Sequence, residues 1–234
     1  LMTRRLNLSQ HNLLALMRAW LSQRWEPLFF LVLFCLLSLQ VFLFIGGTLA
    51  VSTTVGGGVA AFAAFELFVA RDLSSVTVPL IALPLLLLVL SGRKPHWLRR
   101  YLDAVGIYVV VRMLIQLFGL NLLVFDSVTP RFTLITQLLF FLPYSLLVWG
   151  WVYWRLNAVA GVGKSQWFRL DCEHETPRPI DYILASFASV FSASISSIKG
   201  RSARAKALIL IHGFFVYDLM GLTLSRAVAL IQSR

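Results

Sequence analysis

Residues 28–50 read LFFLVLFCLLSLQVFLFIGGTLA, and this uncharged stretch decides the fold class. As a helix it would extend about 34 Å, which is long enough to cross the hydrocarbon core of a bilayer. The whole chain has the same character, because 59% of its 234 residues are hydrophobic and only 13% are charged. Soluble domains average about a quarter charged residues. The composition therefore indicates an integral membrane protein and excludes a soluble enzyme domain, a disordered tail and a disulfide scaffold.

Three later segments are also long and apolar. Residues 101–124 and 132–154 read as further spans, and the second ends in WGWVYW, an aromatic cluster typical of the headgroup level. Residues 203–231 form the last long helix. These segments predict an all-α membrane protein.

The stretch between residues 55 and 91 is ambiguous. Residues 55–70 are short, begin near three glycines and contain Glu66, whereas residues 76–91 are more apolar but contain two prolines. Either both segments span, or the first lies at the interface and only the second spans. The fold therefore has five transmembrane helices or, as the alternative, six.

The first 27 residues form a separate unit in this prediction. Within residues 9–25, Leu13, Leu16, Met17, Trp20 and Leu21 fall on one helical face, with two arginines off it. This pattern predicts an amphipathic helix that lies in the membrane plane and ends at Pro27. The alternative is a short helix packed on its own protein.

The basic residues favour five spans. The chain carries a net charge of +11, and its Lys and Arg residues gather beside apolar segments, which indicates membrane anchoring and not nucleic-acid binding. With five spans, the amino end and the connections 92–100 and 155–206 share one side, with sixteen Lys and Arg against four on the other. With six, the division is eight against twelve. The positive-inside rule prefers the first solution, with the amino end in the cytoplasm.

The carboxyl-terminal part, from Asp181, reads DYILASFASVFSASISSIKGRSARAKALILIHGFFVYDLMGLTLSRAVALI. It resembles the pore helix, filter and inner helix of bacterial two-transmembrane potassium channels. Asp181, Ser186 and Phe187 match the D…SF of the pore helix, and Arg226 matches the arginine that often closes the inner helix. The stretch is still more similar to bacterial membrane proteins that keep this module without a potassium filter. Those proteins share a WYW-like aromatic end before the module and an SRRAK-like basic turn within it.

The filter positions depart from the potassium-channel pattern. The resemblance places Ser192, Ala193, Ser194, Ile195 and Ser196 where potassium channels carry T-V-G-Y-G. Glycine is required there because alternate residues adopt backbone angles that side chains disfavour, at a cost of about 1–3 kcal/mol each. The five-span topology also turns the module over relative to a potassium channel. Both observations argue against a potassium-selective filter.

Three ionisable residues lie within predicted membrane segments, where charges are expensive and are usually paired. They are Glu66, Arg112 and Asp218. An Arg112–Asp218 or Arg112–Glu66 pair would neutralise the arginine. Such a pair would act as a structural bridge between helices or, alternatively, form part of an ion or proton pathway.

Small residues recur at helical spacing in two places. Ala185, Ser189, Ala193 and Ser197 form one stripe, and Gly213, Gly221 and Ser225 form another. Such stripes indicate close helix packing in lipid, with a serine-lined conduit as the alternative for the first.

The remaining motifs predict no chemistry. Residues 171–175 read DCEHE, which we interpret as a solvated acidic turn and not a metal site, and no catalytic or cofactor-binding pattern occurs. We therefore expect a non-enzymatic bacterial inner-membrane protein without cofactors, whose partners are the bilayer and other membrane subunits or further copies of itself. The alternative is a weakly selective ion channel. The expected units are an interfacial helix at 1–27, a transmembrane bundle at 28–154, a polar connection at 155–180, and a re-entrant pore-like helix with an inner helix at 181–234.

Overall fold

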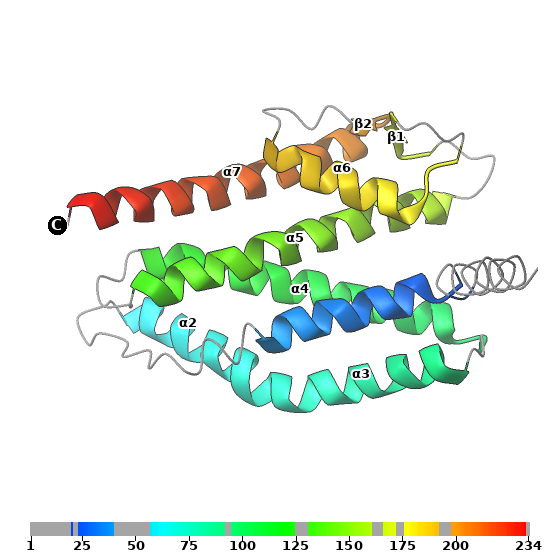
Figure 1. The fold of residues 1–234 in the computed structure, drawn as a ribbon, viewed down its shortest axis with the longest axis horizontal. Coiled ribbons are helices and arrows are strands. Elements are labelled where there is room, and N and C mark those ends of the chain that lie inside the picture. The colour runs from blue at the N-terminus through cyan, green and yellow to red at the C-terminus, as the bar shows by residue number, and fades with distance from the viewer. Residues whose placement is uncertain are drawn as a thin grey trace, which may run out of the picture.

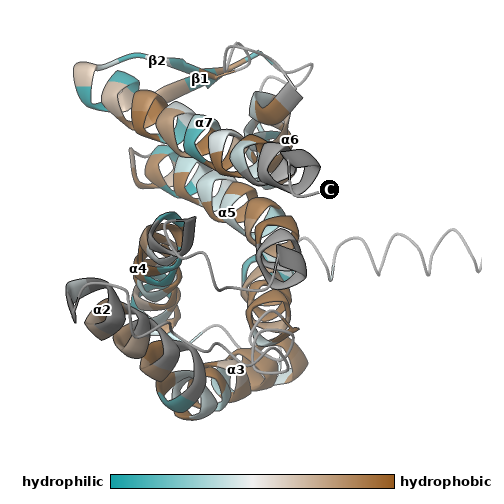
Figure 2. Ribbon diagram, turned by 90° about the vertical axis from the view of Figure 1, so that its left-hand side faces the viewer, coloured by the Kyte–Doolittle hydropathy of each residue, from teal (hydrophilic) through white to brown (hydrophobic). Residues whose placement is uncertain are grey.

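The computed structural model describes residue 20 and residues 23–39, 57–91, 95–124, 131–160, 166–171, 176–191 and 198–232. These residues are mostly helical, in agreement with the expected class. Three helices combine the length and the hydropathy needed to cross a membrane, as an integral membrane protein requires: Ser74–Ser91, Leu98–Asn121 and Ala203–Ser225. Figure 2 shows apolar residues along the lengths of the bundle helices.

The elements follow one another along the chain with short connections. After a helix over residues 23–39 come α2 (Gly57–Phe68), the π-helix η1 (Val69–Leu73), α3 (Ser74–Ser91), α4 (Leu98–Val124), α5 (Arg131–Ala160), β1 (Phe168–Leu170), α6 (Pro179–Phe191), β2 (Ile198–Gly200) and α7 (Ala203–Gln232).

The helix over 23–39, the run 57–91, α4, α5 and α7 lie along the long axis of the molecule (Figure 1). The helix over 23–39, α4 and α7 run in one direction, and the continuous run 57–91 and α5 run in the other. As a result, the start of the helix over 23–39, the end of α3, the start of α4, the end of α5 and the start of α7 lie at one end of the bundle (Figure 1).

The region between residues 57 and 91, which the sequence left ambiguous, is helical throughout. It is a continuous helical run in which the five-residue η1 joins α2 to α3. The run bends near η1 (Figure 1), as expected where a helix changes its hydrogen-bonding period.

Pro27 does not end a helix as predicted, because it lies within the helical run 23–39. Aromatic contacts on both sides of Pro27 hold the helix against α5. The ring centroids of Trp25 and Trp154 are 4.4 Å apart, and those of Phe30 and Trp151 are 5.3 Å apart. Tertiary packing therefore outweighs the one hydrogen bond that proline removes. The rest of the predicted interfacial helix lies outside the described residues, except for residue 20.

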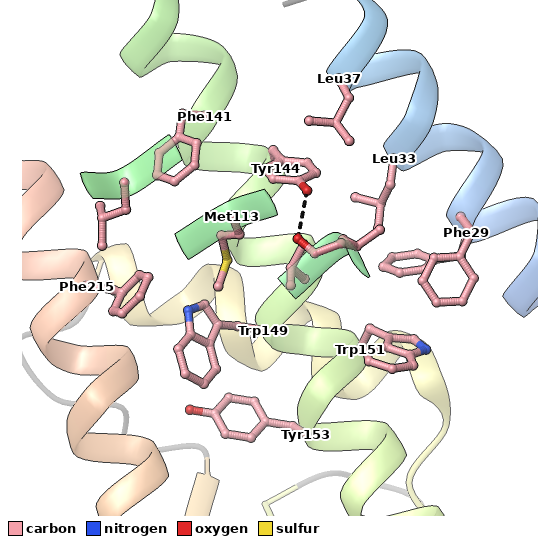
Figure 3. Close-up of a cluster of buried hydrophobic side chains, with 14 of the residues drawn as sticks. Phe29, Leu33, Leu37, Met113, Phe141, Tyr144, Trp149, Trp151, Tyr153 and Phe215 are labelled. Atoms are coloured by element: carbon pink, nitrogen blue, oxygen red, sulfur yellow. Dashed lines mark hydrogen bonds between the residues drawn. The ribbon is translucent and has the colours of Figure 1, made fainter. Parts of the chain in front are cut away.

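The core is aromatic and joins the first helix to α4, α5 and α7 (Figure 3). Phe30, Phe141 and Tyr153 are each 0% exposed. The Tyr144 hydroxyl donates to the Val109 carbonyl across 3.1 Å, the bond dashed in Figure 3. Burying apolar surface does not favour helix association in lipid, because the lipid tails are apolar too. Close packing and hydrogen bonds between helices therefore supply much of the free energy of association.

The predicted polar connection over 155–180 contains regular structure. α5 continues to Ala160, and Phe168–Leu170 pairs antiparallel with Ile198–Gly200 on the far side of α6. The Asn157 side chain fixes this small sheet to α5, since Nδ2 donates to the Phe168 carbonyl at 2.9 Å and Oδ1 accepts the Phe168 N–H at 2.9 Å.

Two glycines set the closest helix approaches. A Cβ on Gly106 of α4 would overlap the Trp151 ring of α5, and a Cβ on Gly150 of α5 would lie 2.7 Å from the Ile183 Cα of α6. The α5–α6 contact is between backbones and has little room to adjust.

We predict that Gly150→Val lowers the free energy of unfolding by about 1–3 kcal/mol, the usual cost of overpacking a tight contact. Gly213→Val is the matched control, because no atom lies within 4 Å of a Cβ at Gly213. Unfolding in detergent micelles, followed by circular dichroism, compares the two variants. Equal destabilisation by both would contradict the tight α5–α6 contact.

Candidate functional site: a buried arginine against a π-helix

The structure describes only some of the residues that the sequence predicts as site residues. Ser192, Ala193, Ser194, Ile195 and Ser196 lie outside the described residues, so the filter comparison stays a prediction. Glu66 lies on α2, but its side chain is also outside the described part. The arrangement of Arg112 and Asp218 is described.

Arg112 is buried within α4, with 5% of its surface exposed. Its Nη1 donates to the Val69 carbonyl in η1 at 2.7 Å. A charged donor on a buried carbonyl makes a strong hydrogen bond, so this contact ties α4 to the bent run 57–91.

The Val69 carbonyl needs such donors because of the π-helix. A π-turn shifts the backbone N–H groups away from their usual partners, so nearby carbonyls seek side-chain donors. Three hydroxyls supply them: Ser74 to Val69 at 2.8 Å, Ser75 to Asp72 at 2.7 Å, and Thr77 to Leu73 at 2.8 Å. The hydroxyl-rich SSVT at 74–77 was the available sequence signal for this site.

Asp218 is bound to a different residue from the one predicted. Its Oδ2 accepts a hydrogen bond from Asn121 Nδ2 at 2.6 Å, which joins α7 to α4. Arg112 and Asn121 are nine residues apart on one helix. At about 100° per residue they face opposite sides of α4, so Asp218 on the Asn121 side is on the face away from Arg112. The predicted Arg112–Asp218 pair is therefore wrong, whereas the Arg112–Glu66 alternative stays untested.

A charge network that the sequence analysis missed joins three helices at the shared end of the bundle. Arg99 of α4 binds Glu26 with two hydrogen bonds, of 2.8 and 3.0 Å, and also contacts Asp103. Arg155 of α5 binds Asp103 with two more, of 2.6 and 2.8 Å. Trp151 Nε1 donates to Glu26 at 3.0 Å. Two acids and two arginines thus neutralise one another between the helix over 23–39, α4 and α5.

A second buried polar group surrounds His212 of α7. The imidazole is 0% exposed, its Nδ1 lies 2.9 Å from the Tyr153 hydroxyl, and the Trp149 ring stacks on it at 4.8 Å. His212 Nε2 and Trp149 Nε1 have no hydrogen-bond partner. His212 thus packs between α5 and α7.

The segment predicted as a pore helix contains the helix α6, and its motif residues make local contacts where they are described. Asp181 Oδ2 accepts the Arg178 N–H at 2.7 Å and so caps the start of the helix. Ser186 is buried, and so are Ala185 and Ser189 of the first small-residue stripe, whereas Ala193 and Ser197 lie outside the described residues. The second stripe behaves differently, because Gly213 and Gly221 have no neighbour within 4 Å of a Cβ position. The Arg226 side chain lies outside the described residues.

No protein-family model, curated protein or solved structure matches the chain. The resemblance to potassium-channel modules accordingly stays an expectation from the sequence.

Double-mutant cycles test the two polar contacts of α4. Asn121→Ala and Asp218→Ala should show a coupling of about 0.6 kcal/mol, and at most about 1.7, as interhelical hydrogen bonds in membrane proteins do. Arg112→Met and Asp218→Ala should be additive to within about 0.5 kcal/mol, because the two side chains do not meet. The measurement is the free energy of unfolding in mixed micelles. Strong Arg112–Asp218 coupling would contradict the assignment of Asn121 as the partner.

Proposed function

We propose that this chain is a non-catalytic structural subunit of a membrane assembly, built from other subunits or from copies of itself. A potassium-selective channel is not part of the proposal. The observation that carries the proposal is the use of the two described intramembrane charges: Arg112 binds a backbone carbonyl of the run 57–91, and Asp218 binds Asn121 of α4. Both hold helices together.

The five-crossing topology is part of this proposal. The directions of the described helices support it, because the start of the helix over 23–39, the end of α3, the start of α4, the end of α5 and the start of α7 lie at one end of the bundle (Figure 1). The two basic connections and the amino-terminal segment carry most of the Lys and Arg residues. By the positive-inside rule, this end faces the cytoplasm. The pore-like module would then enter from the cytoplasmic side, opposite to a potassium channel.

The outward face of α7 offers a surface for assembly. Leu210, Phe214 and Leu224 are 73%, 70% and 67% exposed, and Gly221 lies on the same stripe with open space beside it. Small residues within an apolar stripe allow a second helix to approach closely in lipid. This face supports contact with another subunit or a second copy.

A weakly selective channel is the alternative. The chain enters α6 from beside β1 and reaches β2, the partner of β1, seven residues after Phe191. The start of α6 and the start of α7 therefore lie at one end, as in a re-entrant segment. A pore of this kind would use Ser192, Ser194 and Ser196 of several copies.

Planar-bilayer recording separates the two functions. We expect purified protein, folded by circular dichroism, to add no ion conductance to the bilayer, because the described polar groups stabilise the bundle. The copy number by native mass spectrometry supplies an independent readout, and a four-fold ring would favour transport. Conductance that disappears in Ser194→Leu or Ser196→Leu, but not in the control Ser225→Leu on α7, would overturn the structural role.

A further inference from the structure

The outer surface of the β1–β2 region is strongly basic. Over the described residues 166–171, 176–191 and 198–206 there are six Lys and Arg and two acidic residues. The basic residues are all exposed: Arg169, Arg178, Lys199, Arg201, Arg204 and Lys206. Of the two acids, Asp181 caps α6 and Asp171 binds Lys199 at 3.0 Å. Among these described residues, basic groups therefore outnumber acidic groups by six to two.

The sheet register places two of these charges side by side. Arg169 and Lys199 are direct cross-strand partners, and both are exposed while Phe168 and Ile198 point inward. Side chains directly opposite in an antiparallel pair lie about 5 Å apart, where like charges are destabilising. Lys199 lowers the pKa of the Asp171 carboxyl through their hydrogen bond, so Asp171 is ionised at neutral pH and offsets one of the two charges.

The start of α7 repeats this unfavourable arrangement. The first turn contains Arg204 and Lys206 and no acidic residue. Cations at a helix N-terminus oppose the helix dipole, because the free N–H groups there carry partial positive charge. Ser202 caps the turn through Oγ, which accepts the Ala205 N–H at 3.1 Å. The unfavourable interaction of Arg204 and Lys206 with the helix dipole therefore persists although Ser202 caps the helix. Such an arrangement is expected where a charge serves a purpose other than stability.

These charges are held on a rigid base. Asn157 of α5 bonds both backbone groups of Phe168 and also donates to the Tyr182 hydroxyl at 2.8 Å. Arg201 N–H donates to the Trp167 carbonyl at 2.9 Å, which extends the β1–β2 pairing toward α7. A preorganised cationic surface loses less entropy when it binds an anion than a flexible tail does.

The position along α7 indicates which anion fits. The candidate membrane span of α7 is Ala203–Ser225, and Arg201, Arg204 and Lys206 lie at its start. The basic surface therefore lies at the level where a bilayer presents its phosphates. Ile180, 51% exposed at the start of α6, adds an apolar contact at the same end.

We propose that the outer face of β1–β2 and the first turn of α7 bind the phosphate headgroups of anionic phospholipids, such as phosphatidylglycerol. The lipid phosphate relieves the Arg169–Lys199 repulsion and completes the N-terminus of α7, while its acyl chains lie along the apolar part of α7. This role holds whether or not the chain assembles with partners, so it is independent of the proposed function.

The test uses the full chain in two kinds of nanodisc. One contains phosphatidylcholine alone, and in the other phosphatidylglycerol makes up about a third of the lipid. Native mass spectrometry measures which lipid stays bound, and thermal unfolding measures stability. We expect preferential retention of phosphatidylglycerol and a higher unfolding temperature with it. In the wild-type protein, both effects should disappear as salt rises from about 0.05 to 0.5 M, because salt screens exposed charges.

Charge variants locate the site. Arg201→Gln/Arg204→Gln should reduce the preference for phosphatidylglycerol by about fivefold for each charge removed. Arg201→Lys/Arg204→Lys keeps the charge and should retain it. Arg93→Gln/Arg100→Gln removes the same charge from the 92–100 connection and should leave the preference unchanged.

Three outcomes would overturn the proposal. The first is equal retention of both lipids by the wild-type protein. The second is an equal loss of preference in the Arg93/Arg100 control, which would indicate general attraction by net charge. The third is an equal rise in unfolding temperature when inorganic phosphate is added to phosphatidylcholine nanodiscs, which would indicate a site for a soluble anion.

Discussion

Charge neutralisation at one end of the bundle determines where three of its helices meet. Glu26 is almost completely buried, and in an apolar environment an unpaired carboxylate would cost several kcal/mol. Arg99 supplies the opposite charge, and Asp103 and Arg155 extend the pairing to α5. Because each partner has a fixed geometry, the network holds the helix over 23–39, α4 and α5 in one register.

The rest of the structure is consistent with this shared end. Asn157 continues the polar contacts from α5 into β1, and β2 brings the start of α7 to the same place. Deeper in the bundle, Arg112 connects one face of α4 to the run 57–91. Asp218 of α7 binds the opposite face of α4 and so connects α4 to α7. The described polar residues thus form hydrogen bonds and ion pairs between helices. These contacts agree better with the proposed structural role than with an ion pathway.

Hydrophobic patterning predicted the class of fold and the approximate positions of α4, α5 and α7, because length and apolarity decide which segments are helical in a membrane. It failed where backbone hydrogen bonding decided the outcome. The residues around η1 read as a break, but the hydroxyls at 74–77 satisfy its carbonyls and the helix continues. Hydrophobic patterning also did not predict the ion pairs of Glu26 and Asp103. Both acids lie at the margins of apolar segments, and residue spacing does not reveal which helix packs against them.

The account depends most directly on the amino end and the two basic connections lying on one side of the membrane. Cysteine labelling in intact cells tests this, with Trp97→Cys, Ser165→Cys and Ser127→Cys placed singly in a chain whose own cysteines are replaced. A membrane-impermeant reagent should leave positions 97 and 165 unlabelled until the cells are opened, and should label position 127 at once. Labelling of 97 and 165 from opposite sides would contradict the account.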